Sequence, residues 1–225
     1  MIPPVFQMIP LVFQMTDRPL TVPVTMQNRR AFLLATAALT LLPALTARAA
    51  GPEQATAFID QLSRDLAGVI NGAGSVTDKQ AGLTKIIDRA VDVADVARFC
   101  LGRFWRIASA EQQAAYLDLF HKVLVKNITG KVGEYQGVTI TVGRAASRET
   151  DILVNSVVNR PGNEPNKVDW LVSLASGGPK IIDVIAEGTS LRLTQRSDYA
   201  AFLSRNNNSV QALIDAIRQQ ANAPG

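Results

Sequence analysis

Residues 168–188 read VDWLVSLASGGPKIIDVIAEG, and this stretch decides the fold. Val168, Trp170 and Val172 alternate with their neighbours at a period of two, which is typical of a half-buried strand. The turn-rich letters SGGP follow, and KIIDVIA then reads as a second strand. Because the connection between the two runs is short, the stretch predicts an antiparallel β-hairpin.

Two further strands are expected before this hairpin. Val138, Ile140 and Val142 alternate with threonines, and residues 152–158 form another largely apolar run. Residues 161–165, PGNEP, separate that run from the next strand and predict another turn. The sequence therefore predicts an antiparallel meander of four strands.

Helical periodicity flanks the strands on both sides. Apolar residues recur at three- and four-residue steps in six segments, and Thr77 and Ser109 are expected to cap two of the helices. The expected helical segments are 53–70, 77–91, 92–105 as one or two shorter pieces broken at Gly102, 109–130, 188–204 and 210–220. Because helices and strands are segregated, we predict an α+β fold, with a four-stranded antiparallel sheet covered by about six helices that enclose an apolar pocket.

The N-terminal region has the pattern of an export signal. Arg29-Arg30 precedes an apolar run over residues 31–45, and Ala47-Arg48-Ala49 has the small-x-small pattern that signal peptidase cuts. The run is shorter than the roughly 18 to 20 residues that cross a bilayer. The paired arginines fit either the general secretory (Sec) pathway or the twin-arginine pathway, and the sequence leaves both open.

These features predict the domain organisation. Residues 1–49 are expected to form a leader and signal peptide, with Met26 as an alternative start. Residues 50–225 show no internal repeat and are expected to form a single domain. The signal predicts that this domain is exported from the cytoplasm.

The charge balance argues against a nucleic-acid partner. The chain has 23 Lys and Arg residues against 19 Asp and Glu residues. Four of the basic residues and one of the acids precede Ala50, so 19 basic and 18 acidic residues remain, a net charge of +1. A domain with so balanced a charge is not expected to have the broad positive surface that binds phosphate backbones.

Several kinds of chemistry are excluded by composition. Cys100 and His121 are the only residues of their types, so an intramolecular disulfide, a thiolate-based structural zinc site and a histidine-based metal site are not expected. The chain has no Gly-x-Ser-x-Gly elbow and no phosphate-binding glycine motif. We therefore expect no cofactor, a helix-surface role for His121 and a buried apolar role for Cys100.

Two strand carboxylates leave an enzymatic alternative open. Asp169 and Asp183 each lie inside a predicted strand, where an apolar environment could raise the pKa of a general base. The structural alternative is that each aspartate lies on the non-core face or pairs with Arg103, Arg192 or Arg196.

Apolar residues exceed what a thin helix-on-sheet interface requires. We predict a cavity between sheet and helices, with a solid core as the alternative. Strand parity and helical phase select ten residues as its apolar lining: Phe104, Trp105, Phe120, Leu124, Ile140, Val154, Trp170, Val172, Ile182 and Val184.

Four motifs together resemble a known family. LGRFWR (101–106), VDW (168–170), IDVIAEGTSL (182–191) and RSDY (196–199) match, in order and spacing over residues 53–218, the MlaC-type (toluene-tolerance auxiliary) family of periplasmic lipid-binding proteins. The resemblance implies a carrier that moves phospholipid between the membranes of Gram-negative bacteria. One branch of the family is associated with hopanoids, so either lipid is a candidate ligand.

The resemblance also implies partners. We expect an inner-membrane lipid ABC transporter complex and an outer-membrane lipoprotein complex as partners of a monomeric carrier. One alternative is a periplasmic enzyme of polyprenoid or hopanoid metabolism with Asp169 or Asp183 as acid or base. The other is an interaction protein with a solid core that docks through its Arg103-rich surface.

Overall fold

The computed structural model describes residues 44–223, which form six α-helices, two short 3₁₀ helices and five strands. In chain order these are α2 (Ala44–Asn71), α3 (Val76–Ala90), α4 (Val93–Leu101), η2 (Gly102–Arg106), α5 (Ala110–Thr129), η3 (Val132–Tyr135), β1 (Thr139–Arg148), β2 (Asp151–Asn159), β3 (Asn166–Ser173), β4 (Lys180–Ala186), β5 (Thr189–Ser190), α6 (Leu191–Arg205) and α7 (Val210–Asn222). The predicted α+β class is confirmed. No helix in this part of the chain has both the length and the apolar character needed to cross a membrane.

The sheet is an antiparallel meander in the order β1-β2-β3-β4-β5. Four of its strands are those the sequence predicts, and the prediction of only four strands is corrected by β5. This fifth strand has two residues, too few to produce a periodic pattern, and Ser190 then caps α6 by accepting a hydrogen bond from the Leu193 N–H. The helix expected from Gly188 therefore begins three residues later.

Helices α3 and α5 each begin at a serine that exchanges hydrogen bonds with the residue three positions later. Ser109 caps α5 as predicted, and it exchanges hydrogen bonds with Gln112 in a capping box. The prediction that Thr77 caps α3 is wrong, because Ser75 occupies that place. Its Oγ accepts from the Asp78 N–H at 3.1 Å, and Asp78 accepts from the Ser75 N–H at 3.0 Å. The two side chains together satisfy two otherwise unpaired backbone donors, the N–H groups of Ser75 and Asp78.

Helix α2 is longer than its apolar pattern predicts. It runs through Pro52 back to Ala44, so it includes the predicted cleavage motif 47–49. Residues 1–43 of the predicted leader, with Met26 and the paired arginines, lie outside the described residues. The signal peptide, its pathway and the boundary at residue 50 stay predictions.

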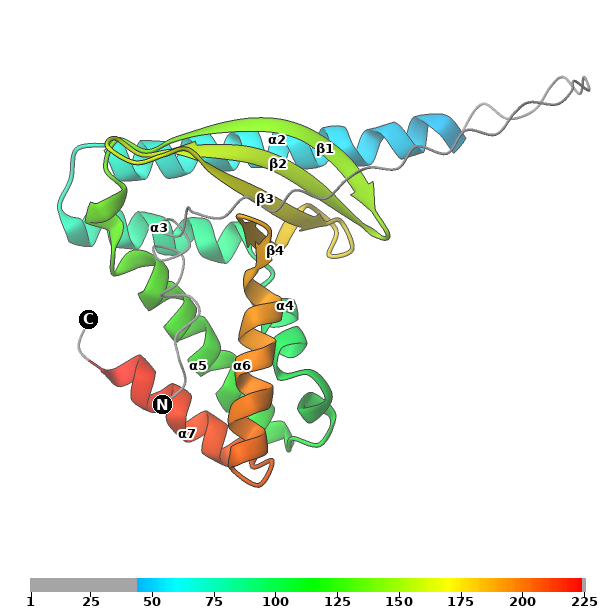
Figure 1. Cartoon of the computed structure of the whole chain (residues 1–225), viewed down its shortest axis with the longest axis vertical. Coiled ribbons are helices and arrows are strands. Elements are labelled where there is room, and N and C mark those ends of the chain that lie inside the picture. The colour runs from blue at the N-terminus through cyan, green and yellow to red at the C-terminus, as the bar shows by residue number, and fades with distance from the viewer. Residues whose placement is uncertain (1–43, 224–225) are drawn as a thin grey trace, which may run out of the picture.

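The described chain has two hydrophobic cores rather than the single helix-on-sheet core that the sequence predicts. The sheet core lies between the strands and helices α2 and α3, and the helical core joins α4, η2, α5, α6 and α7. Figure 1 shows the two parts, with the sheet, α2 and α3 at one end and the other four helices extending away from them. Helix α5 connects the parts, since its C-terminal end reaches the sheet core.

The helical core is densely packed around aromatic rings. Tyr116 is fully buried, and its hydroxyl donates to the Ala97 carbonyl oxygen at 2.8 Å. Its ring centroid lies 5.8 Å from that of Phe120 and 6.2 Å from that of Tyr199, the second in an edge-on arrangement. Aromatic pairs at such separations add stability beyond their buried area.

Candidate functional site

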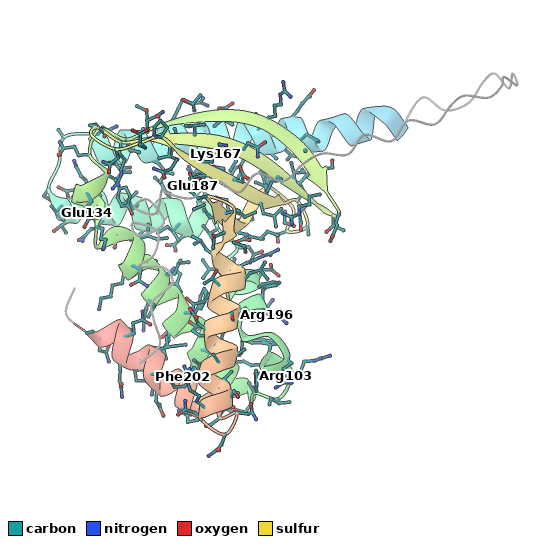
Figure 2. All side chains as sticks on the ribbon, in the orientation of Figure 1. Arg103, Glu134, Lys167, Glu187, Arg196 and Phe202 are labelled. Atoms are coloured by element: carbon teal, nitrogen blue, oxygen red, sulfur yellow. The ribbon has the colours of Figure 1, made fainter. Side chains whose placement is uncertain are left out.

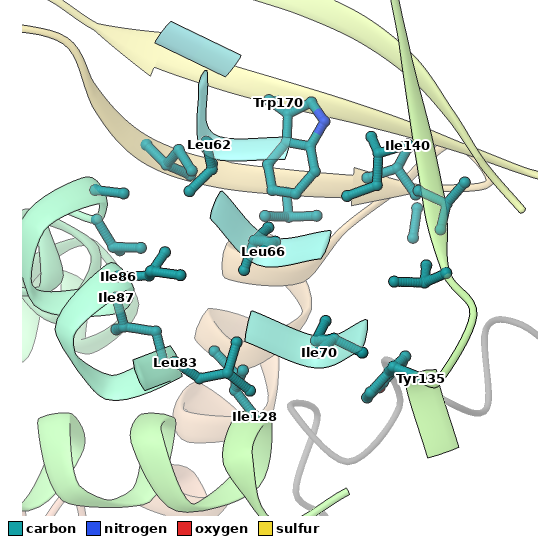
Figure 3. Close-up of a pocket in the computed structure, with 18 of the residues that line it drawn as sticks. Leu62, Leu66, Ile70, Leu83, Ile86, Ile87, Ile128, Tyr135, Ile140 and Trp170 are labelled. Atoms are coloured by element: carbon teal, nitrogen blue, oxygen red, sulfur yellow. The ribbon is translucent and has the colours of Figure 1, made fainter. Parts of the chain in front are cut away.

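The sheet core contains a cavity of about 220 Å³. Side chains from α2, α3, the end of α5, η3, β1 to β4 and the start of α6 line it, as Figure 3 shows for 18 of them. The lining residues are Leu62, Leu66, Ile70, Leu83, Ile86, Ile87, Ala90, Val91, Asn127, Ile128, Tyr135, Val138, Ile140, Val158, Val168, Trp170, Ile181, Val184, Ala186 and Leu191. The predicted cavity is therefore present, between the sheet and the first two helices of the described chain.

The cavity wall is almost entirely hydrocarbon. Only Asn127, Tyr135 and Trp170 among its lining residues carry polar side-chain atoms, and none carries a charge. The Trp170 indole N–H donates to Ser156 Oγ at 2.9 Å, and Ser156 in turn donates to the Val168 carbonyl oxygen at 2.7 Å. This chain satisfies the indole donor within the sheet, so the ring contributes apolar surface to the cavity.

Three of the ten predicted lipid-binding residues line the cavity: Ile140, Trp170 and Val184. Val154 and Val172 are fully buried in the same core but are not among the lining residues. Phe104, Trp105, Phe120 and Leu124 lie in the helical core. Ile182 is buried outside both cores.

A β-bulge explains the position of Ile182. Val172 pairs with Ile181, whereas Leu171 pairs with Asp183, so Ile182 is the extra residue between two registers. A bulge shifts strand parity by one residue. Ile181 therefore lines the cavity in the place that simple alternation assigns to Ile182.

Sequence reasoning missed the helical side of the wall. Leu62, Leu66 and Ile70 from α2 face Leu83 and Ile86 from α3 across the cavity (Figure 3). Both stripes have clear helical periodicity in the sequence. The signal was present, but periodicity identifies an apolar face without identifying the partner against which it packs.

Neither strand carboxylate reaches the cavity. Asp169 accepts a hydrogen bond from Asn155 Nδ2 at 2.8 Å, on an exposed part of the sheet. Asp183 is buried and pairs with Arg192, one of the arginines proposed for it, with 3.6 Å between Asp183 Oδ2 and Arg192 Nε. Neither is a lining residue, so neither is placed to act on a molecule held there.

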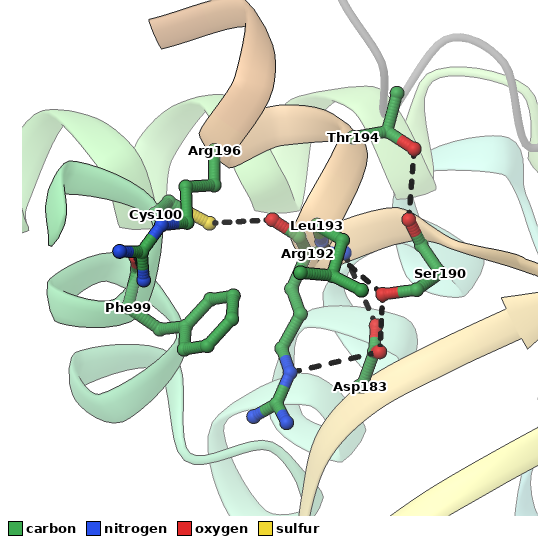
Figure 4. Close-up of polar contacts among 8 residues, drawn as sticks. All are labelled: Phe99, Cys100, Asp183, Ser190, Arg192, Leu193, Thr194 and Arg196. Carbon is green, nitrogen blue, oxygen red and sulfur yellow. Dashed lines mark hydrogen bonds and ion pairs between the residues drawn. The ribbon is translucent and has the colours of Figure 1, made fainter. Parts of the chain in front are cut away.

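Asp183 instead fixes the corner between β4 and α6, as Figure 4 shows. Its carboxylate accepts from Ser190 Oγ at 2.5 Å and from the Arg192 N–H at 3.1 Å. The Arg192 and Arg196 guanidinium carbons lie 4.3 and 4.9 Å from the centroid of the Phe99 ring. These contacts attach the helical core to the sheet.

The remaining candidate groups have structural roles. Cys100 is buried and its thiol donates to the Arg192 carbonyl oxygen at 3.6 Å, and burial raises the pKa of that thiol. His121 Nε2 lies 2.6 Å from Asp88 Oδ1 on the surface between α5 and α3. Within residues 44–223, no three His, Cys, Asp or Glu side chains gather as a metal site would require.

An α+β domain with a hydrocarbon-lined cavity and no charged group in its wall has the character of a protein that binds apolar molecules. Comparison with known proteins is consistent with this class. The family model described as MlaC protein matches residues 58–219, so the chain belongs to the MlaC family.

A solved structure shows the same architecture. The phospholipid-binding protein from Ralstonia solanacearum, determined in complex with a phospholipid, is 25% identical in sequence to this chain, with a TM-score of 0.64. The match covers 75% of this chain and 97% of that protein.

Proposed function

We propose that this protein holds the acyl chains of a phospholipid in the sheet-core cavity and carries the lipid between membranes. The observation that supports this most directly is the uncharged, hydrocarbon-lined wall of the cavity. Membership of the MlaC family and the phospholipid bound by the Ralstonia relative support the same conclusion.

Burial of hydrocarbon supplies enough binding energy without specific polar contacts. Each buried methylene contributes about 0.8 kcal/mol, so a sixteen-carbon chain gains on the order of 12 kcal/mol relative to water. Most of this gain is independent of which lipid head is attached. A cavity of this kind therefore suits a carrier of membrane lipids.

The cavity must widen to hold a whole diacyl lipid. A dry apolar cavity of about 150 Å³ accommodates benzene, with six carbons, whereas two sixteen-carbon chains bring about 32 carbons. A volume of about 220 Å³ is closer to the first case. Lipid uptake therefore requires the elements around the cavity to move apart.

The cellular setting belongs to the same proposal. The export signal and the family assignment support a periplasmic location. There the carrier would receive lipid from one membrane complex and deliver it to another, an inner-membrane ABC transporter complex and an outer-membrane lipoprotein complex. Hopanoid is a second candidate ligand, since a fused hydrocarbon ring system is equally apolar.

The enzymatic alternative receives less support. It assigns acid or base chemistry to Asp169 or Asp183, and both carboxylates lie away from the cavity in hydrogen bonds of their own. We infer a binding protein that returns its ligand unchanged. Incubation with candidate lipids followed by mass spectrometry should show no new product.

Lipid extraction and native mass spectrometry test the proposal. The full chain, exported and purified from the periplasm of its own bacterium, should carry phospholipid in near-stoichiometric amount. Leu66→Trp places a larger ring in the cavity and should lower lipid per folded protein by at least about threefold. Leu193→Trp is the matched control, because Leu193 is 56% exposed on α6 and lies outside the lining.

Two results would contradict the proposal. One is wild-type protein that is folded and carries no lipid, either as purified or after incubation with phospholipid vesicles. The other is an equal lipid content in both tryptophan variants, which would place the bound lipid outside the cavity.

A further inference from the structure

Polar groups gather at one end of the otherwise apolar cavity. Figure 3 shows Tyr135 there beside Ile70, and Asn127 immediately precedes Ile128, which the figure shows at the same end. The Nδ2 atom of Asn127 is buried and has no hydrogen-bond partner within residues 44–223. An unsatisfied buried donor costs free energy, so its retention beside a ligand cavity calls for an explanation.

Tyr135 supplies a second donor at this end. Its phenol hydroxyl is able to donate a hydrogen bond, and the residue lines the cavity. Burial raises the pKa of the phenol to about 12, so the group is neutral and able to donate at ordinary pH. The Trp170 donor elsewhere in the wall is already accepted by Ser156.

The alternation of side chains along β2 places Arg160 at the same end of the cavity as Tyr135. Ser156 and Val158 lie on the cavity side of β2, and Arg160 follows at the same parity just beyond the end of the strand. The guanidinium carbon of Arg160 lies 5.9 Å from the centroid of the Tyr135 ring. The cation is therefore at the phenol that lines the cavity.

A glycine permits this approach of the two loops. Gly137 has φ +80°, and a Cβ atom at that position would lie 2.7 Å from Cγ of Pro161. Any other residue would push the segment that follows η3 away from the β2–β3 turn, and Arg160 away from Tyr135 with it. Close contact between these two segments is thus built into the backbone.

We propose that Asn127, Tyr135 and Arg160 receive the phosphate-bearing head of an anionic amphiphile while its tails fill the rest of the cavity. This inference rests on the proposed lipid-binding function and adds selection by head group to it. All three groups can donate hydrogen bonds, and a guanidinium matches phosphate oxygens two at a time. The adjacent acid Glu134 is exposed, so solvent screens its charge (Figure 2).

A competition between two lipids tests the inference. The delipidated full chain is incubated with vesicles that contain phosphatidylglycerol and diacylglycerol with identical tails in equal amounts. Wild-type protein should take up phosphatidylglycerol in preference by about tenfold, as expected for one hydrogen-bonded charge pair at a partly buried site. Arg160→Gln should lower this ratio by at least about threefold, because it removes the charged partner of the phosphate.

Lys167→Gln is the matched control. Lys167 also belongs to the β2–β3 hairpin and is exposed, but it lies one residue before the cavity-lining Val168 and so on the opposite face of the sheet. This variant removes the same charge and should keep the wild-type ratio. Asn127→Leu is a second test. It removes the unpaired donor at nearly constant volume and should also lower the ratio of phosphatidylglycerol to diacylglycerol uptake.

The outcomes separate the inference from the proposed function. If wild-type protein takes up neither lipid, lipid binding itself fails. If both lipids enter equally, or if Arg160→Gln keeps the wild-type ratio, the head-group site is wrong and lipid binding stands. A third arm uses inorganic phosphate alone. Binding of free phosphate at Arg160 together with an unchanged lipid ratio would identify an anion site that is unrelated to the cargo, and would overturn the inference.

Discussion

The sheet core and the helical core are both built from apolar side chains, but the sheet core encloses a cavity and the helical core is filled at its centre by aromatic rings. In the helical core Tyr116, Phe120 and Tyr199 fill the centre with rings that contact one another. The sheet core is walled chiefly by Leu, Ile and Val, and it surrounds a cavity of about 220 Å³. Apolar composition alone therefore does not decide whether a core encloses a void.

Polar contacts connect α3 to its neighbours at both of its ends. One end of α3 is attached to the sheet, where the Asp92 N–H donates to the Ile181 carbonyl oxygen at 2.9 Å. At the other end Lys79 Nζ donates to the Ile70 carbonyl oxygen at 2.7 Å. These contacts join α3 to the sheet at one end and to α2 at the other, and the cavity lies among the apolar side chains between them. In the helical core, packing itself sets the distance between helices.

A pair of identical truncations gives the largest expected contrast between the cores. Leu124 in the helical core and Leu62 in the cavity wall are each 3% exposed. Leu124→Ala should lower the free energy of unfolding by about 4 kcal/mol and Leu62→Ala by about 2 kcal/mol, since a side chain that already faces a void loses fewer contacts. Urea denaturation measures both. Equal losses would mean that the sheet core is as well packed as the helical core.

Enlarging a side chain should also destabilise the helical core more than the sheet core. Leu213→Phe forces extra volume into a filled core and should cost about 1–3 kcal/mol of unfolding free energy. Leu83→Phe points into the cavity and should cost less than about 1 kcal/mol. Lipid content should fall only in the Leu83 variant. A penalty of several kcal/mol for Leu83→Phe would show that the cavity is not available space.

The three tyrosines allow a smaller, spectroscopic comparison. Burial raises the pKa of Tyr116 and of Tyr199 well above the usual range, and that of Tyr135 to about 12. At pH 11 about a tenth of Tyr135 should be ionised, against about nine tenths in the unfolded chain. Raised folded-state values contribute stability that is fully present below about pH 10 and is lost as the pH rises through about 12. Absorbance at the tyrosinate band follows the titration.

Tyrosine-to-phenylalanine variants assign the titration steps. Tyr135→Phe should remove the first ionisation of the folded protein, and Tyr116→Phe should not change it. If folded wild-type protein showed a tyrosine with an ordinary pKa near 10, the burial of Tyr135 in the cavity wall would be wrong.

The strand meander could be predicted from sequence because each strand carries its own alternation. The same is true of the Ser109 cap, whose signal is local. By contrast, the assignment of Phe104, Phe120 and Leu124 to the cavity was wrong. It required knowing whether the apolar face of each helix packs against the sheet or against other helices. That depends on contacts between residues far apart in the chain, and helical periodicity does not specify them.

Local exceptions account for the other differences. Ile182 is displaced by a bulge, which has no sequence signature in a run of consecutive apolar residues. Ser75 and Thr77 are both good caps, and each has a side-chain acceptor three residues later, Asp78 or Gln80, so the local sequence does not distinguish them. Asn127 and Tyr135 could not be placed at the cavity from sequence, because each is a single polar residue near the end of a helical segment.

The most direct test uses the two tryptophans of the chain, since Trp170 lines the cavity and Trp105 packs against the helical core. A phospholipid with brominated acyl chains quenches indole fluorescence only at contact. In Trp105→Phe protein, uptake of this lipid should strongly quench the remaining Trp170. In Trp170→Phe protein, which keeps an aromatic ring in the wall, the emission of Trp105 should be unchanged. Quenching of Trp105 with Trp170 unaffected would contradict the placement of lipid tails in the sheet core.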